Sequence, residues 1–340
     1  MSETTATLRK GDVVEVRSAA EILSTLDERG ERDSLPFMPE MVAMCGRRYT
    51  VAARTERICD TITGGWGSRT MADAVVLDGA SCDGSGHGGC AAACLIYWKE
   101  SWLRKVADGA TERSAPADDD AARDSLLALA LRNARSDADG EPIRFRCQAT
   151  QAIEASFPVS SKDPRSLVRA CSSGNVPVGR FIRVMARAVV MESAKRLHLL
   201  PNPPLRGESG SSTRTPRLDL QPGEWVRIKS PEDIRATLND KGKNRGLWFD
   251  REMLQLCGQV FRVRHRVDRL IDERTGEMIE LSSDCVALEG AVCSGEHSVG
   301  RWFCPRAIYP YWREGWLERV ETEAEVSLPS AKATRQPTPV

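Results

Sequence analysis

Residues 11–60 read GDVVEVRSAAEILSTLDERGERDSLPFMPEMVAMCGRRYTVAARTERICD, and residues 223–272 read GEWVRIKSPEDIRATLNDKGKNRGLWFDREMLQLCGQVFRVRHRVDRLID. The two stretches align without a gap, and chance does not produce such agreement over this length. The identical pairs include Gly11/Gly223, Ser18/Ser230, Ile22/Ile234, Leu26/Leu238, Phe37/Phe249, Glu40/Glu252, Met41/Met253, Cys45/Cys257 and Gly46/Gly258. With short gaps the match continues through VVLDGASC (75–82) against VALEGAVC (286–293), and it ends on YWKESWLRKV (97–106) against YWREGWLERV (311–320). The chain therefore contains a duplicated unit of small-domain size.

Each copy carries the pattern of a small β domain. The opening Gly-x-x-Val-x-Val alternates like a half-buried strand, and Ser18 and Ser230 are typical N-caps of a short helix. Residues 47–58 and 259–271 predict long strands, 272–278 has the composition of a hairpin turn, and 285–290 predicts a returning strand. We expect a mostly β fold with an α segment (α+β), in which two tandem small SH3-like barrels are linked by a helical region. A plain small β-sandwich is the alternative.

The composition changes along the chain predict its domain boundaries. They are an N-terminal tail (1–10), a first cysteine-containing barrel repeat (11–106), a linker with a short helix (107–140), a helical middle segment (141–200), a linker (201–222), a second barrel repeat (223–320) and a disordered tail (321–340).

The middle segment ends in a long predicted helix within residues 177–199. Arg180, Arg183 and Arg187 share one face of it. A basic stripe opposite an apolar face suits weak association with an anionic membrane surface. We favour the alternative of a helix that packs its apolar face on the rest of the protein.

Three cysteine pairs recur between the copies: Cys45/Cys257, Cys82/Cys293 and Cys90/Cys304. The last pair is assigned by spacing, since Cys90 and Cys304 stand equally far before Trp98 and Trp312. A closed metal site needs a fourth ligand. In the second copy this predicts the set Cys257, Cys285, Cys293 and Cys304. In the first copy it predicts the set Cys45, Cys59, Cys82 and Cys90, with Cys94 as a substitute ligand or a free thiol.

The histidines offer a second solution. His87 and His297 both fall between the last two shared cysteines of their copy, so a Cys3His site would serve both copies. Either ligand set suits Zn²⁺, and an iron–sulfur cluster is the alternative for four thiolates. Cys147 and Cys171 have no counterpart in the repeat, and we expect Cys171 to be a spare thiol on a helix.

Bulk composition restricts the classes of function. The chain has 340 residues, and its 48 basic and 48 acidic residues give a formal net charge of zero, unlike a typical nucleic-acid binder. The first residues lack an apolar signal core, and no apolar run reaches the roughly 18 residues of a membrane-spanning helix. We therefore expect a cytoplasmic protein without membrane insertion, in which the 11 cysteines are ligands, buried thiols or redox groups.

No P-loop, G-x-S-x-G, H-E-x-x-H or dinucleotide-binding motif occurs in the sequence. Candidate bases beside a catalytic metal are Asp83, His87, Glu296 and His297, and none stands in a motif that specifies a reaction. The paired tryptophans Trp98/Trp102 and Trp312/Trp316 could stack on a base or sugar, but we expect them to close the core of each copy.

The stretches CGRRYTVAARTERICD, CDGSGHGGCAAACLIYWKESWL, IRFRCQAT and CSGEHSVGRWFCPRAIYPYWREGWL, with the two helix openings after Ser18 and Ser230, resemble a family of uncharacterised bacterial proteins that carry both copies. The resemblance covers nearly the whole chain except the linkers and the tail. It implies the two-copy architecture and no activity.

These observations favour a zinc-stapled tandem-repeat protein that binds a protein or peptide partner. The first alternative is an iron–sulfur or other metal-dependent redox enzyme with its reactive site in the first copy. The second is a nucleic-acid-binding barrel protein that uses the basic strand RVRHRVDR (262–269).

Overall fold

The computed structural model describes residues 7–63, 67–106, 120–136, 141–160, 163–199, 201–213, 216–281, 284–298 and 300–320. The predicted linker at 107–119 and the predicted tail at 321–340 lie outside these residues. The fold is mixed α/β, mostly strands with a few helices, and has a curled half-barrel sheet and a second sheet. The chain forms two compact units: unit 1 contains Met1–Ile182, Leu270–Ile279 and Gly300–Arg306, and unit 2 contains Arg183–Arg269, Glu280–Val299 and Ala307–Val340.

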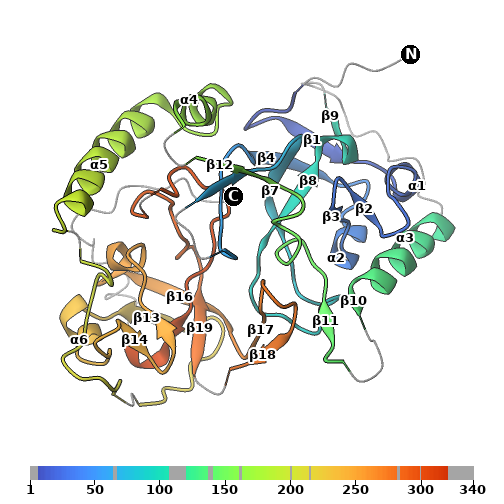
Figure 1. Ribbon diagram of the computed structural model, residues 1–340. Helices are drawn as coiled ribbons and strands as arrows, with labels where there is room; N and C mark the ends of the chain where they lie inside the picture. The colour runs from blue at the N-terminus through green and yellow to red at the C-terminus, as the bar shows by residue number, and fades with distance from the viewer. Residues whose placement is uncertain are drawn as a thin grey trace. The chain divides into compact units, whose positions relative to one another are not determined.

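The main sheet of unit 1 has five antiparallel strands in the order β8-β7-β4-β1-β9 (Figure 1). Its strands are β1 (Val13–Val16), β4 (Arg48–Arg54), β7 (Ala74–Ser81), β8 (Leu95–Lys99) and β9 (Leu103–Lys105). A 3₁₀ helix, η1 (Glu100–Trp102), joins β8 to β9, which returns to pair with β1. The register between β4 and β7 shifts at Val51/Ala53.

The main sheet of unit 2 repeats this plan in the order β20-β19-β16-β13-β21. Its strands are β13 (Trp225–Ile228), β16 (Val260–Arg266), β19 (Cys285–Leu288), β20 (Trp312–Arg313) and β21 (Leu317–Arg319), with the 3₁₀ helix η3 (Glu314–Trp316) before β21. Even the register shift recurs, at Val263/His265, the positions aligned with Val51 and Ala53. The two copies predicted from the sequence therefore have the same strand order.

The paired tryptophans lie in the cores, as predicted. All four are fully buried. Phe37 meets Trp98 and Trp102 edge-on, at 6.2 and 5.3 Å between ring centroids. In the second copy, Phe249 meets Trp312 and Trp316 in the same way, at 6.3 and 5.4 Å. Their burial leaves these rings no face for stacking on a ligand.

The predicted helices are present. Ser18 caps α1 (Ala19–Leu23) through a capping box with Glu21, and Ser230 caps α6 (Pro231–Arg235). The remaining α-helices are α2 (Pro39–Val42), α3 (Asp120–Asn133), α4 (Pro164–Ser172) and α5 (Val178–Arg196); η2 (Met253–Leu256) is a 3₁₀ helix. α3 packs on α1 and α2 within unit 1 (Figure 1). None of the described helices combines the length and apolar content needed to cross a bilayer.

α5 has apolar side chains on more than one side. Val184, Ala188 and Met191 form a buried stripe, as expected for a packed helix. A second set, Val178, Ile182, Val189 and Val190, is between 62% and 68% exposed.

Short strands complete the fold. They are β2 (Glu31–Arg32) with β3 (Leu35–Pro36), β10 (Arg135–Ser136) with β11 (Arg144–Phe145), β14 (Lys243–Asn244) with β15 (Leu247–Trp248), β17 (Arg269–Ile271) with β18 (Met278–Glu280), and β5 (Ile58–Cys59) with β6 (Ser68–Thr70) and β12 (Phe157–Val159). The predicted hairpin at 272–278 is the turn between β17 and β18.

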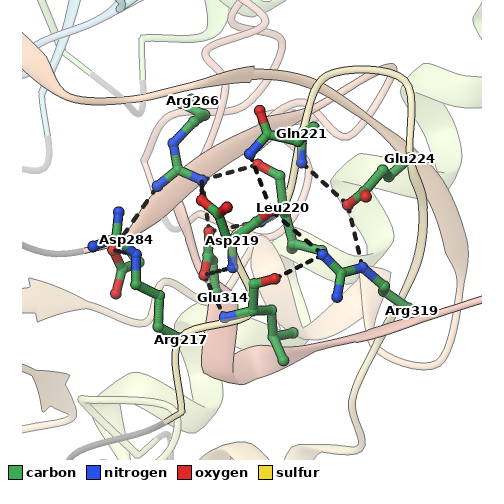
Figure 2. Close-up of polar contacts among 10 residues, drawn as sticks. Arg217, Asp219, Leu220, Gln221, Glu224, Arg266, Asp284, Glu314 and Arg319 are labelled. Carbon is green, nitrogen blue, oxygen red and sulfur yellow. Dashed lines mark hydrogen bonds and ion pairs between the residues drawn. The ribbon is translucent and has the colours of Figure 1, made fainter.

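A buried carboxylate anchors the end of each main sheet. In unit 2, Glu314 accepts hydrogen bonds from the backbone amides of residues 218, 219 and 220 and from Arg266 Nη1 at 2.8 Å (Figure 2). Burial opposes ionisation of Glu314, but Arg266 and the amides outweigh it and lower its pKa. The first copy has the equivalent ion pair between Arg54 and Glu100.

Candidate metal centre

Three potential metal ligands meet in unit 1. Glu40 lies in the single turn of α2, Cys82 follows the end of β7, and His87 lies in the glycine-rich loop after Cys82. Glu40 Oε1 lies 2.7 Å from His87 Nδ1 and 3.6 Å from Cys82 Sγ. Their ligand atoms all lie within 4.8 Å of one another.

The loop that carries His87 is tightly turned. The His87 and Gly89 amides both donate to the carbonyl of Gly84, at 3.0 and 2.9 Å. Gly84 has a φ of 75°, and a Cβ there would stand 2.2 Å from the carbonyl oxygen of Cys90. Only glycine fits at this position, so the sequence of the loop fixes where the His87 ring points.

Both ring nitrogens of His87 face oxygen atoms. Nε2 lies 3.2 Å from the carbonyl oxygen of Arg146, and Nδ1 lies 2.7 Å from Glu40 Oε1. Burial opposes ionisation of Glu40, but the hydrogen bond and charge of His87 and the Gly86 amide outweigh it and lower the pKa of Glu40. The carbonyl and an ionised carboxylate can only accept, so each hydrogen bond is donated by the ring.

The buried carboxylate is incompletely satisfied. Glu40 and His87 side chains are each only 1% exposed, and Glu40 Oε2 has no hydrogen-bond partner. A buried acceptor without a partner is costly. Burial, and then the adjacent Glu40, raise the pKa of Cys82 well above its ordinary value, so this thiol is protonated and a poor nucleophile. A divalent cation would satisfy Oε2 and stabilise the Cys82 thiolate together.

The separation of sulfur and oxygen fits a zinc ion, whereas the separation of nitrogen and oxygen is shorter than zinc ligands require. Zn–S and Zn–O bonds of about 2.3 and 2.1 Å in a tetrahedron place sulfur and oxygen about 3.6 Å apart, and Cys82 Sγ and Glu40 Oε1 are separated by 3.6 Å. Nitrogen and oxygen ligands would stand about 3.4 Å apart, so His87 Nδ1 must move from its present hydrogen bond with Glu40. The Nε2–H bond to a backbone carbonyl is the support that zinc-bound imidazoles ordinarily have.

The second copy provides an internal comparison. Glu252, the counterpart of Glu40, is equally buried at 7% exposed. Its two oxygens accept from the amides of Ser294, His297 and Ser298 and from the Ser294 hydroxyl. Both glutamates thus organise the loop after the shared cysteine. Only Glu40 faces a histidine ring and a thiol in this arrangement, among the residues that the structure describes.

Other thiols surround the first-copy site. The Cys82 thiol interacts electrostatically with the thiols of Cys94 and Cys147, and the Cys82 amide donates to the Cys94 carbonyl at 2.8 Å. Burial raises the pKa of Cys94 to about 12 and raises that of Cys147. Cys147 was expected to lie outside both copies. It directly follows Arg146, whose carbonyl oxygen contacts the His87 ring. Cys90 lies partly buried in the loop.

Cys59 and Cys304 lie together in unit 1. The Cys59 amide donates to Cys304 Sγ at 3.2 Å, and the two thiols are hydrogen-bonded. Arg306 Nη1 lies 3.8 Å from Cys59 Sγ. The hydrogen bond with Cys304 and the charge of Arg306 outweigh burial and lower the pKa of Cys59 to about 6, while that same bond and burial raise the pKa of Cys304. Cys59 was expected beside Cys45, Cys82 and Cys90, and Cys304 beside the other second-copy cysteines.

The remaining predicted ligands have separate surroundings. Cys45 is in the apolar core of unit 1. Burial raises the pKa of Cys257 to about 11. Cys285 is buried with its sulfur 3.2 Å from Arg313 Nη1, and the Cys293 amide donates to the Ile308 carbonyl. The His297 ring contacts Arg187 at 3.1 Å. In the described part of the second copy these side chains form no group comparable to Glu40, Cys82 and His87.

Among the predicted bases, Asp83 binds the Ser85 amide and Glu296 pairs with Arg187. Sequence reasoning missed Glu40 as a candidate ligand, although its identity with Glu252 in the alignment marked it. Comparisons with family models, curated proteins and solved structures found no match to this chain.

Proposed function

We propose that the protein is a zinc-stapled tandem-repeat binding protein, with Glu40, Cys82 and His87 as zinc ligands. The single observation that supports this most strongly is that the three ligand atoms lie within 4.8 Å of one another, at a buried carboxylate whose second oxygen, Oε2, has no hydrogen-bond partner. One sulfur, one nitrogen and one oxygen suit zinc, whereas iron–sulfur clusters are held mainly by thiolates. Cys94 and Cys147, whose thiols interact with that of Cys82, are the candidates for a fourth ligand.

Zinc would stabilise the loop that follows β7. Residues 82–94 contain no regular element, and they contribute few apolar side chains to the core. A metal ion that joins Cys82 and His87 to α2 would supply folding free energy that this loop lacks. In the second copy, Ser294 and backbone amides satisfy both oxygens of Glu252 and tie the corresponding loop to it.

At the level of the fold, we propose that each copy is an SH3-like barrel. Two features support this: four strands in meander order, and a fifth strand that follows a 3₁₀ turn and returns to the first. Small barrels of this kind commonly serve as binding modules, which agrees with a protein without a catalytic motif.

We propose a protein or peptide as the partner. The exposed apolar side chains of α5 support a protein partner, because a single helix here exposes four large aliphatic side chains to solvent. The arginines of the basic strand β16 make internal contacts: Arg262 with the Gly223 carbonyl, Arg264 with Tyr309 and Arg266 with Glu314. They are therefore less available to a phosphate backbone, and the proposal does not extend to nucleic acid. Vesicle flotation and partner capture, each carried out with the wild type and with Ile182→Asp, distinguish a membrane surface from a protein as the partner of α5.

Metal analysis of the purified protein tests the zinc proposal. We expect a colourless protein with close to one zinc per chain, loss of zinc in Cys82→Ser, and no loss in Cys293→Ser, the matched change in the second copy. A brown protein with iron, or equal zinc in the wild type and Cys82→Ser, contradicts the proposal.

A further inference from the structure

The segment 300–306 runs beside the outer edge of β5. Ser68 Oγ donates to the Gly300 carbonyl at 2.9 Å, and Arg57 Nε donates to the Trp302 carbonyl at 3.2 Å. The Cys59 amide donates to Cys304 Sγ, and not to the carbonyl of a further strand. The fold of unit 1 thus holds the sulfur of residue 304 against residue 59, 245 positions away in the chain.

A buried guanidinium completes this arrangement. Arg306 is 6% exposed, and its Nη1 contacts the carbonyl and sulfur of Cys59 and the Thr61 hydroxyl. Its Nη2 pairs with Glu273 at 3.1 Å. Two thiols that served only as small apolar side chains would not need a desolvated cation beside them.

A tyrosine hydroxyl with no partner lies within electrostatic reach of the same pair. Tyr97 is 3% exposed, its hydroxyl makes no hydrogen bond, and it interacts electrostatically with Arg306, Cys304, Cys59 and Cys94. A buried hydroxyl without a partner can bind a small polar molecule or a newly formed polar group.

We propose that Cys59 and Cys304 form a redox-active dithiol that hydrogen peroxide oxidises to a reversible disulfide. The Cys59 thiolate attacks one peroxide oxygen, the O–O bond breaks, and the departing hydroxide takes a proton to become water. Cys304 then loses its proton and attacks the sulfur of the Cys59 sulfenic acid. The S–O bond breaks, the S–S bond forms, and the hydroxyl leaves with that proton as a second water.

Two further observations agree with this assignment. Arg306 Nη1 lies 3.8 Å from the sulfur of Cys59, which suits Cys59 as the attacking thiolate, and the pKa of Cys59 is lowered while that of Cys304 is raised. Cys285 also has an arginine against its sulfur, but burial raises its pKa, so a guanidinium alone does not activate a thiol in this chain. The proposal does not depend on zinc at Glu40, Cys82 and His87.

Mapping of disulfides in the full-length protein tests the proposal. Reduced protein is treated with a small excess of hydrogen peroxide, alkylated, digested without reductant and analysed by mass spectrometry. We expect a linked pair of peptides containing Cys59 and Cys304, released by dithiothreitol and formed roughly tenfold faster than Cys285 is oxidised. Cys285→Ser should keep the link.

Cys304→Ser should leave Cys59 as a sulfenic acid that dimedone traps. The wild-type map needs no variant, so a misfolded Cys304→Ser protein does not obscure the answer. Cys59 and Cys304 that remain thiols while other cysteines oxidise, or Cys59 that proceeds to a sulfinic acid without the linked peptide, would overturn the proposal.

Discussion

Zinc binding at Glu40, Cys82 and His87 should release at least one proton per ion. The raised pKa of Cys82 means that its thiol is protonated near neutral pH. Zinc binds the thiolate, so it must displace the Cys82 proton.

The magnitude follows from this count. Each proton released makes the apparent binding free energy more favourable by about 1.4 kcal/mol per pH unit, so the Cys82 proton corresponds to about a tenfold gain in affinity per unit. The gain should hold between about pH 6 and 8, where the Cys82 thiol stays protonated without zinc.

Calorimetric titration with zinc in buffers of different ionisation enthalpy measures the protons directly. The expected slope is at least about one for the wild type and the same for Glu252→Gln, which alters the matched carboxyl of the second copy. A slope near zero, or an affinity independent of pH, would refute the protonation state assigned to Cys82.

Two changes outside the ligands probe the supporting structure. Gly84→Ala should abolish zinc binding in metal analysis, because its Cβ would stand 2.2 Å from the Cys90 carbonyl. Gly79→Ala should keep zinc, because that glycine has a φ of 74° and nothing within 4 Å of its Cβ position. Equal zinc content in the two variants would refute the role of the loop. Glu314→Gln should lower the free energy of unfolding by about 3 kcal/mol in urea titrations, because Arg266 loses its buried partner. The folded pKa of Glu314 lies below its unfolded value of 4.5. Its contribution to the free energy of unfolding should therefore be present above pH 4.5 and disappear as the pH falls through the folded value. A difference in stability between wild type and variant that stays unchanged in acid would contradict this.

The repeat alignment predicted the features that depend on local sequence. Ser18 and Ser230 cap their helices, the hairpin lies at 272–278, and Trp102 and Trp316 occupy equivalent core positions, where their indole nitrogens bond Thr25 and Thr237. These outcomes follow from side-chain chemistry within a few residues and from apolar periodicity. Both are visible in the order of the amino acids.

The placement of the cysteines did not follow from the alignment. Spacing to Trp312 paired Cys304 with Cys90, but that spacing reports only the position of each cysteine before the matching tryptophan. Residues 300–306 belong to the loop between β19 and β20 and pack in unit 1. Long-range packing therefore decided the neighbour of Cys304, and no pattern near Cys59 indicated it.

Glu40 shows the opposite case: the alignment marked the residue, but the sequence did not indicate what it contacts. A carboxylate in a short helical turn normally faces water. The identity of Glu40 and Glu252 marked both positions, yet only the tertiary structure shows that each carboxylate is buried beneath its own loop. The two copies differ in the partner of this carboxylate, which is a histidine ring for Glu40 and backbone amides for Glu252. This difference is also a property of the folded loop.

X-ray absorption at the zinc edge of the purified protein tests the central claim most directly. The account predicts a shell of one or two sulfur ligands at about 2.3 Å and at least two nitrogen or oxygen ligands at about 2.0–2.2 Å, with the sulfur signal lost in Cys82→Ser. A shell of four sulfurs, or a sulfur signal that survives in Cys82→Ser, would contradict it.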